Sequence, residues 1–355
     1  MIFTRLLILF LVLAAFSLSA QGYDYFQVLP DKPLAPKDNP VTSEKALLGK
    51  TMFFDTRLSF YGDVSCNSCH NLAAGGDDDG GAVNMPGRHI KRSVPSVWNV
   101  GYMSTYYWDA RKPTLESQLV DHIVDPNIMQ FSTTQNLVSR LSAVPGYQPL
   151  FEKAFGKGKI TIAKIAQAIS SFERTLIVPN SRFDQFMRGN KAALNDNEKR
   201  GMHLFKEKGC LSCHFGTNFA GPAPGPALKM GDGFYELFPT SRGSYYEEKY
   251  NLLADKGRFA VTLDEGDRLM WRVPSLRNIV NTAPYFHNGS VSDLHQAVRI
   301  MADVQFKNYD VSDKGVDDIV AFLKTLTGQY PQITLPEIPD TPGLSLIPKK
   351  AQNEK

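Results

Sequence analysis

The sequence has few cysteines, little net charge and, beyond its first twenty residues, no long apolar run. Four cysteines occur in 355 residues, and their positions leave none for a structural disulfide. Lys and Arg total 39 against 36 for Asp and Glu, so the net charge of +3 does not indicate nucleic-acid binding. No stretch after residue 20 reaches the roughly 20 apolar residues of a membrane-spanning helix. We therefore expect a globular protein that binds no nucleic acid and does not insert its mature chain into a membrane.

The first twenty residues have the composition of a targeting segment. A positive start, Met1 to Arg5, precedes an apolar run from Leu6 to Phe16 and small residues from Ser17 to Ala20. The apolar run is too short for a membrane anchor, which needs roughly 20 residues. We predict that residues 1–20 are a signal peptide, cleaved near residue 20, and that the mature chain is soluble in the periplasm.

All four cysteines belong to two copies of one motif, Cys66-Asn-Ser-Cys69-His70 and Cys210-Leu-Ser-Cys213-His214. Two thiols at this spacing can form thioethers with the two vinyl groups of one haem, and the next histidine reaches the iron. Zinc sites and thioredoxin-like redox motifs are the alternatives, but a histidine after both pairs in an exported chain favours haem. The sequence therefore predicts two covalently attached c-type haems, with His70 and His214 as proximal iron ligands.

Helical patterns surround both motifs. Residues 41–60 are typical of a helix and a turn, and apolar residues from Ile162 to Ile177 keep a helical period. A capped helix start is expected at 195–198, and a closing helix at about 316–326. We expect a mainly α fold with long loops, divided into an N-terminal domain, 21–190, and a C-terminal domain, 191–330. The proline-rich tail, 331–355, is expected to extend over the surface.

Six segments of the chain, spread from about residue 40 to 340, resemble one known family. They are LGKTMFFDTRLS at 48–59, WDAR at 108–111, NSRFDQFMRG at 180–189, PSLRN at 274–278, APYFH at 283–287 and IVAFLKTLT at 319–327. In these segments the sequence resembles the bacterial di-haem cytochrome c peroxidases and their MauG-like relatives. The resemblance implies two cytochrome c-like domains, in which a low-potential N-terminal haem meets hydrogen peroxide. It also implies a high-potential C-terminal haem that takes electrons from a small cytochrome c or a cupredoxin, and a homodimer as one expected assembly.

The resemblance also suggests distal iron ligands. Met301 falls at the family's ligand position for the C-terminal haem, where a thioether sulfur favours the ferrous state and a high potential. A core methionine is the alternative role for Met301, and Met230 and Met270 are weaker ligand candidates. For the N-terminal haem, a loop histidine commonly blocks the distal face, and His89 is the histidine of the equivalent loop. In strict register Met85 takes that position, and a solvent-facing His89 beside an open haem is the remaining alternative.

Three residues concern peroxide chemistry. Trp108 matches the tryptophan that lies between the two haems in the family, where an indole can carry electron transfer. The family's distal glutamate falls at Ile128, which cannot move a proton, so the resemblance implies an altered distal pocket. His122, beside Asp121, lies where the family commonly has a proline. It is a candidate for acid–base chemistry or iron binding, with a helix-surface histidine as the alternative.

A calcium ion between the domains is a further implication of the resemblance. Thr282 and Pro284 lie where backbone carbonyls would bind it, but Ser93 replaces the expected asparagine. The sequence alone therefore leaves calcium as an open expectation.

Three functions agree with these residues. The first is a peroxidase that reduces hydrogen peroxide with an altered distal pocket. The second is a MauG-like enzyme that oxidises a partner protein, and the third is a non-catalytic di-haem electron-transfer cytochrome. Met301 favours the first and third, because the oxidising relatives have a tyrosine at the second haem, whereas Ile128 argues against an ordinary peroxidase. We expect the first.

Overall fold

The computed structural model describes residues 25–78, 88, 90–223, 234–305, 310–341, 343 and 346. Helices are the main regular element of these ranges, in which the strands form one two-stranded antiparallel sheet of β1 (Tyr235–Leu237) and β2 (Met270–Arg272). The expectation of a mainly α fold is confirmed. No helix within the described ranges is long and apolar enough to cross a membrane. The predicted signal peptide lies outside the described residues.

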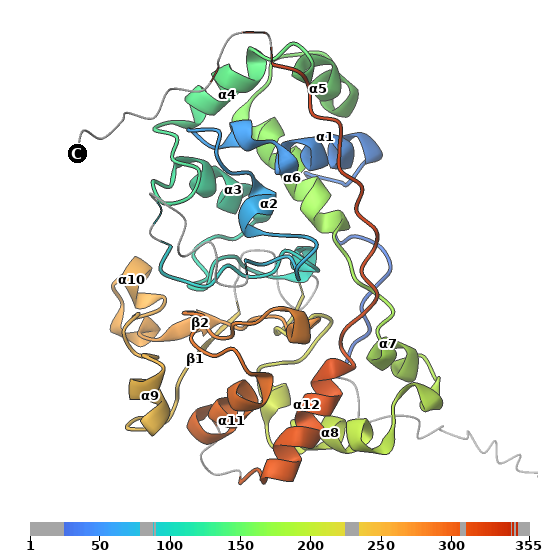
Figure 1. Ribbon diagram of the computed structural model, residues 1–355, viewed down its shortest axis with the longest axis vertical. Coiled ribbons are helices and arrows are strands. Elements are labelled where there is room, and N and C mark those ends of the chain that lie inside the picture. The colour runs from blue at the N-terminus through green and yellow to red at the C-terminus, as the bar shows by residue number, and fades with distance from the viewer. Residues whose placement is uncertain are drawn as a thin grey trace, which may run out of the picture.

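The helices of the N-terminal half form one end of the molecule (Figure 1). They are α1 (Ser43–Phe54), α2 (Cys66–Cys69), α3 (Leu115–Val124), α4 (Thr134–Ser142), α5 (Tyr147–Phe155) and α6 (Ile162–Thr175). The predicted amphipathic helix is α6, which begins after Thr161, whose hydroxyl accepts a hydrogen bond from the Lys164 N–H. Gly49 lets α1 lie directly on α6, because a Cβ there would be 2.0 Å from the Ala168 carbonyl oxygen. This close packing forms the N-terminal core.

The other end of the molecule contains four longer helices of the C-terminal half (Figure 1). They are α7 (Arg182–Met187), α8 (Asp196–Glu207), α11 (Leu294–Gln305) and α12 (Asp313–Lys324), while α9 (Tyr245–Lys249) and α10 (Phe259–Thr262) lie beside the sheet. As predicted, Asn195 and Glu198 form a capping box at the start of α8. Gly201 lets α8 lie directly on α12, as Gly49 does for α1 and α6, because a Cβ there would be 1.8 Å from the Asp318 carbonyl oxygen. The closing helix begins three residues earlier than expected, at Asp313.

Two stretches, residues 93–115 and 272–294, have the same backbone signature. Each contains Val-Pro-Ser followed by an asparagine in the left-handed region, Asn99 with φ 61° and Asn278 with φ 60°. Each asparagine opens a 3-10 helix, η3 (Val100–Tyr102) or η7 (Ile279–Asn281). Both stretches then form an isolated bridge, Tyr106 with Lys112 and Tyr285 with Val291, around a second positive φ, at Tyr107 and Phe286. The chain therefore contains two copies of one structural unit, in which Trp108 and His287 occupy equivalent positions.

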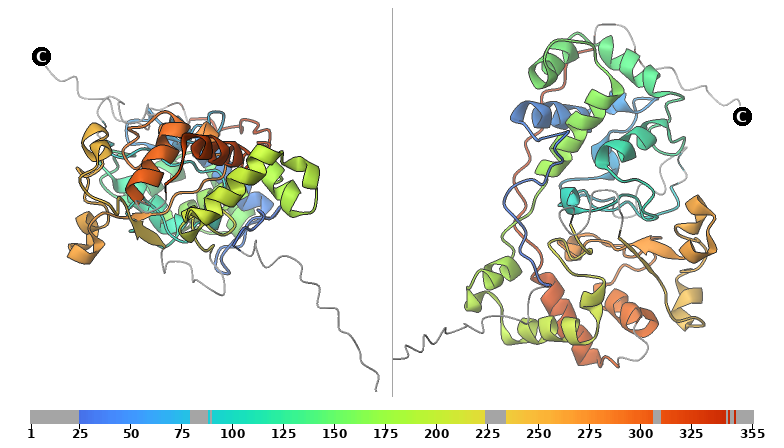
Figure 2. Two further views of the ribbon diagram at one scale, coloured as in Figure 1. Left: turned by 90° about the horizontal axis from the view of Figure 1, so that it is seen from below. Right: turned by 180° about the vertical axis from the view of Figure 1, so that it is seen from behind.

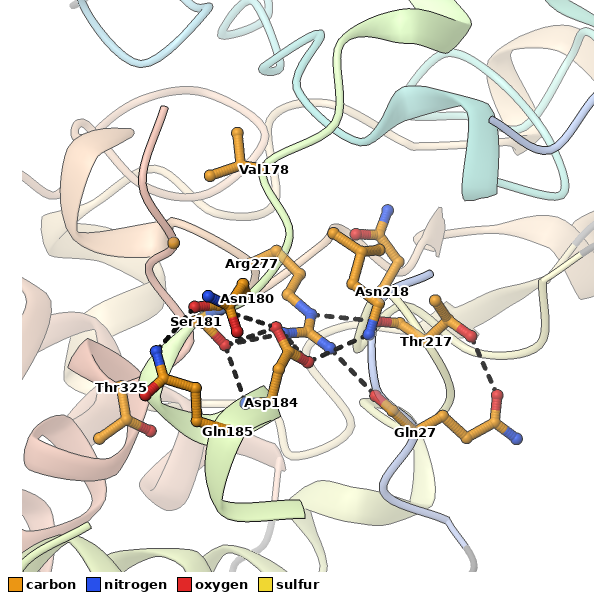
Figure 3. A network of polar contacts seen from close by, with 12 residues as sticks. Gln27, Val178, Asn180, Ser181, Asp184, Gln185, Thr217, Asn218, Arg277 and Thr325 are labelled. Atoms are coloured by element: carbon orange, nitrogen blue, oxygen red, sulfur yellow. Dashed lines mark hydrogen bonds and ion pairs between the residues drawn. The ribbon is translucent and has the colours of Figure 1, made fainter. Parts of the chain in front are cut away.

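A buried ion pair joins the segments that meet between the two ends (Figure 3). Arg277 Nη1 lies 3.0 Å from the Asp184 carboxylate at the start of α7, and neither side chain is exposed. Arg277 also donates Nη2 to the Gln27 carbonyl and Nε to the Thr217 carbonyl, each at 3.0 Å. This guanidinium thus ties the N-terminal segment, α7 and the loop after the second motif together.

The chain after α12 runs back along the outside of the molecule toward the N-terminal helices (Figures 1 and 2). Residues 327–341 have no regular secondary structure, and of the predicted tail, 331–355, the structure describes 331–341, 343 and 346. Tyr330 packs edge to face on Trp98, with ring centres 5.0 Å apart. Further along, Lys50 Nζ donates to Thr334 Oγ1 at 3.0 Å, and Arg57 donates to the Pro339 carbonyl at 2.8 Å. The tail therefore connects the two ends of the molecule.

Candidate haem and peroxide site

One large cavity lies between the two halves and reaches both cysteine motifs. Its volume is about 1080 Å³, and its lining includes Cys66, Cys69, His70, Cys210, Cys213 and His214. Ligand pockets are commonly roughly 300 to 1,000 Å³. None of the four cysteines forms a disulfide, and burial raises the pKa of Cys69 to about 11 and of Cys210 to about 12. The four side chains are therefore neutral thiols that line the same cavity.

Both motif histidines are oriented by backbone carbonyls. His70 Nδ1 lies 3.1 Å from the Pro95 carbonyl, and His214 Nδ1 lies 2.9 Å from the Phe219 carbonyl. A proton on Nδ1 leaves the Nε2 lone pair for a metal, the usual arrangement of a ligating histidine. Burial lowers the pKa of both rings, which favours the neutral ligand form. Two thiols and one oriented imidazole in each half are a donor set that fits a c-type haem.

Met301 is the methionine of α11 that lines the cavity, together with the second motif. Met270 lies on β2 and is not part of the lining, and Met230 lies outside the described residues. The structure thus places Met301 in the same cavity as His214, and its role as an iron ligand stays a prediction.

The predicted loop ligands, His89 and Met85, lie outside the described residues. Arg88, the residue before His89, is buried and pairs with Asp63 at 2.9 Å. It also donates Nε to the Ile128 carbonyl at 3.0 Å. Sequence reasoning missed this arginine, because its partners are distant in the chain. Arg88 therefore fixes the backbone at Ile128.

His122 and Ile128 line the cavity near Tyr107. The His122 ring meets the Tyr107 ring edge to face, with centres 5.2 Å apart. Arg111 Cζ lies over the Tyr107 ring, 3.4 Å from its centre. Asp121, the acidic neighbour of His122 in the sequence, pairs with Lys112 at 2.7 Å instead of with the imidazole. The alternative of an outward-facing surface histidine is wrong. Burial lowers the pKa of His122 to about 3, so its imidazole is neutral near pH 7.

Sequence reasoning also missed Glu173, a carboxyl group of α6 that lines the cavity. Burial raises its pKa to about 8, although Arg174 opposes this shift. Arg174 itself pairs with Glu116 at 2.6 Å and so contributes little to neutralising its neighbour. Glu173 lies four residues after Ile169 and three before Leu176, both buried, and this helical spacing is the one sequence signal that distinguishes it from a surface glutamate.

Trp108 lies on the cavity wall between the two motifs. Its indole Nε1 donates to the Ser93 carbonyl at 2.8 Å, and its own carbonyl accepts a bond from the Arg272 N–H at 2.8 Å. In the second copy of the unit, the His287 carbonyl accepts a bond from the Ser93 N–H at 2.8 Å, and the His287 ring stacks on Trp271 with centres 4.0 Å apart. The structure therefore places Trp108 at the junction of the halves, while its electron-transfer role stays a prediction.

The two residues expected to bind calcium, Thr282 and Pro284, also line the cavity. A Cβ at Gly289 would lie 3.2 Å from Pro284 and 3.5 Å from Ser93, so this glycine lets the two segments approach. Over the described ranges no cluster of three or more His, Cys, Asp or Glu side chains could hold a metal ion. A site of backbone carbonyls is a different arrangement, and calcium stays a prediction.

Comparison with known proteins identifies the family. A family model described as di-haem cytochrome c peroxidase matches residues 43–192. The cytochrome c551 peroxidase of Nitrosomonas europaea is 37% identical over 337 residues, covering 93% of this chain and 96% of that protein. The cytochrome c551 peroxidase of Pseudomonas aeruginosa is 35% identical over 328 residues, covering 91% and 90%. A solved MauG-like protein associated with microbial copper homeostasis has a TM-score of 0.68 at 28% identity, covering 87% of this chain and 96% of that one. Because these relatives span both motif-bearing halves, the chain belongs to the di-haem cytochrome c peroxidase family.

Proposed function

We propose that the chain is a periplasmic peroxidase that reduces hydrogen peroxide to water, with electrons from a small cytochrome c or a cupredoxin. The observation that supports it best is the single cavity, which contains His122 and Ile128 near the first motif, Trp108 at the junction and Met301 near the second motif. Electron transfer between two cofactors requires them to lie close together, and one cavity shared by both motifs allows this. The reaction consumes two electrons and two protons for each peroxide and releases two water molecules.

The donor sets determine how the cofactors would be held. Cys66, Cys69 and His70 would hold the first haem, and Cys210, Cys213 and His214 the second, with Met301 as its distal ligand. When bound, each haem supplies an iron that gains or loses one electron, and the first also supplies the site at which peroxide reacts. The carbonyls of Pro95 and Phe219 keep both imidazoles in the ligating orientation.

Proton transfer is assigned to His122. Peroxide cleavage needs a group that takes the proton from one oxygen and returns it to the other, which contributes about a hundredfold or more in rate. Ile128 cannot do this, whereas the His122 imidazole lines the same pocket and is neutral near pH 7, as a proton acceptor must be. Its very low basicity predicts slower turnover than a well-matched general base would give.

A second candidate, a di-haem cytochrome that transfers electrons without reacting with peroxide, is favoured by Ile128. The deciding experiment adds peroxide to the half-reduced protein and follows both haems by low-temperature electron paramagnetic resonance, then measures turnover with a reduced small cytochrome c. A first haem that becomes high-spin after one electron, followed by oxidation of two cytochromes per peroxide, supports the peroxidase. A first haem that stays low-spin and inert to peroxide supports the electron carrier. A mass gain in a partner protein on peroxide addition would instead indicate MauG-like oxidation.

A further inference from the structure

Arg272, at the end of β2, presents a buried guanidinium to the cavity. The residue is 7% exposed and lines the cavity wall. Its Nε donates to the Tyr107 carbonyl at 3.1 Å, and its Cζ lies 5.9 Å from the centre of the Trp108 ring. The side chain is therefore held in one place at the junction of the two halves.

This guanidinium has fewer partners than the other buried arginines. Arg57, Arg88, Arg174 and Arg277 each pair with a carboxylate. Arg140 forms no ion pair but donates three hydrogen bonds to backbone carbonyls, whereas the Arg272 guanidinium donates one, from Nε. Arg272 forms no ion pair with a described residue, although Tyr106 and the Asp109 carboxylate act on it electrostatically. That carboxylate is already shared by Arg92 and Arg111. Burial lowers the pKa of Arg272 to about 10, so it is still charged near pH 7.

A buried charge without a partner is strongly unfavourable, so a lone guanidinium facing a ligand cavity indicates an anionic ligand. The cavity contains the attachment motifs of two c-type haems, whose anionic groups are their carboxylate side chains. Guanidinium and carboxylate form paired hydrogen bonds of matching geometry. We infer that Arg272 forms an ion pair with a carboxylate side chain of the haem held by Cys210 and Cys213.

The position of Arg272 in the chain assigns it to the second haem. It lies two residues before Pro274, whose backbone interacts with the His214 ring. In the first copy of the repeated unit the equivalent position is Ser93, two residues before Pro95, the partner of His70. Serine has no charge, so the two haems differ in this contact.

This difference has an electrostatic consequence. A cation near a haem stabilises the reduced, less positive iron and raises its reduction potential. Arg272 would therefore raise the potential of the second haem, in addition to any contribution from Met301. The inference rests on haem attachment at the second motif, which is part of the proposed function, but it does not require reaction with peroxide.

The test is a spectroelectrochemical titration of the full chain with both haems attached. For Arg272→Gln we expect the ratio of reduced to oxidised second haem at a fixed potential to fall about tenfold, equivalent to about 59 mV for one electron. The first haem is expected to shift much less. Arg272→Lys keeps the charge and should stay near the wild-type potential. Arg268→Gln is the matched control, because Arg268 lies four residues away, is exposed and pairs with Glu265 at the surface.

Four outcomes would overturn the inference. Equal shifts in Arg272→Gln and Arg268→Gln would show a general charge effect, and a larger shift of the first haem would contradict the assignment. A wild-type potential that changes when phosphate replaces chloride at constant ionic strength would identify a mobile anion as the partner. If Arg272→Gln does not accumulate with both haems, Arg272→Lys decides the question. A potential of the second haem that falls in Arg272→Lys by the full amount expected for loss of the charge contradicts the inference. Because no peroxide is used, a protein inert to peroxide can still show the predicted shifts, and the proposed function then fails alone.

Discussion

Trp108 and His287 occupy equivalent positions in the two copies of the repeated unit, and the carbonyl of each accepts a hydrogen bond from the other half. Arg272 N donates to Trp108, and Ser93 N donates to His287, both at 2.8 Å. The side chains break this symmetry, because the indole bonds to the Ser93 carbonyl while the imidazole stacks on Trp271. A junction with a symmetric backbone and different side chains agrees with the proposal that the two haems have different tasks.

Replacing Trp108 by phenylalanine tests its role in electron transfer. The change keeps an aromatic ring but removes the 2.8 Å bond to Ser93, which should lower stability by about 1 kcal/mol. We expect peroxide-dependent oxidation of a reduced cytochrome to slow, while haem content and both reduction potentials stay the same. The control is Trp98→Phe, since Trp98 also lines the cavity and its buried Nε1 has no partner among the described residues. Equal turnover in both variants would show that Trp108 only fills space.

Restoring a carboxyl group at Ile128 tests the altered distal pocket. Ile128→Glu should speed the reaction of the half-reduced protein with peroxide by roughly a hundredfold, the usual contribution of a positioned acid–base group. Arg88, bonded to the backbone at this position, keeps the new side chain at the cavity. Ile128→Gln has the same shape but cannot transfer a proton, so stopped-flow rates that rise equally in both variants would contradict proton transfer as the cause.

The features that the sequence predicted well are encoded locally. The capping box of Asn195 and Glu198, the amphipathic pattern of α6 and the two cysteine motifs each lie within a short stretch. Arg272 and Glu173 were missed, because their role depends on contacts with distant parts of the chain. Both line a cavity formed by segments far apart in the sequence, and Arg272 bonds to the Tyr107 carbonyl. The repeated unit was missed for another reason: the two copies share backbone angles and Val-Pro-Ser, but few other side chains.

His122 and Asp121 are neighbours in the sequence but do not pair, for a geometric reason. Adjacent residues on a helix point about 100° apart, so an acidic neighbour in sequence does not face the histidine. Lys112 takes the carboxylate on the outer side, and Tyr107 meets the imidazole on the cavity side.

Glu173 makes stability depend on pH in a direction that can be worked out. Burial raises its pKa from the ordinary 4.5 to about 8, so between these values the folded state keeps a proton that the unfolded state has lost. This contribution to stability is therefore lost as the pH rises through that window. Glu173→Gln should flatten the decline in melting temperature from about pH 5 to pH 8. The exposed Glu248→Gln should leave the profile unchanged, and an identical profile in Glu173→Gln would contradict a protonated buried carboxyl.

The ion pair of Arg277 and Asp184 should be the most sensitive polar contact of the fold. Both side chains are fully buried, so Asp184→Asn leaves the guanidinium without a counter-charge, and breaking such a pair costs about 3–5 kcal/mol. Urea unfolding of the haem-loaded protein should show this loss, with the released Gln27 and Thr217 segments becoming accessible to proteolysis first. Glu265→Gln breaks the exposed pair with Arg268 and should leave stability almost unchanged, because solvent screens an exposed ion pair. Similar losses in the two variants would mean that solvent reaches Arg277, and the junction would then not depend on this buried contact.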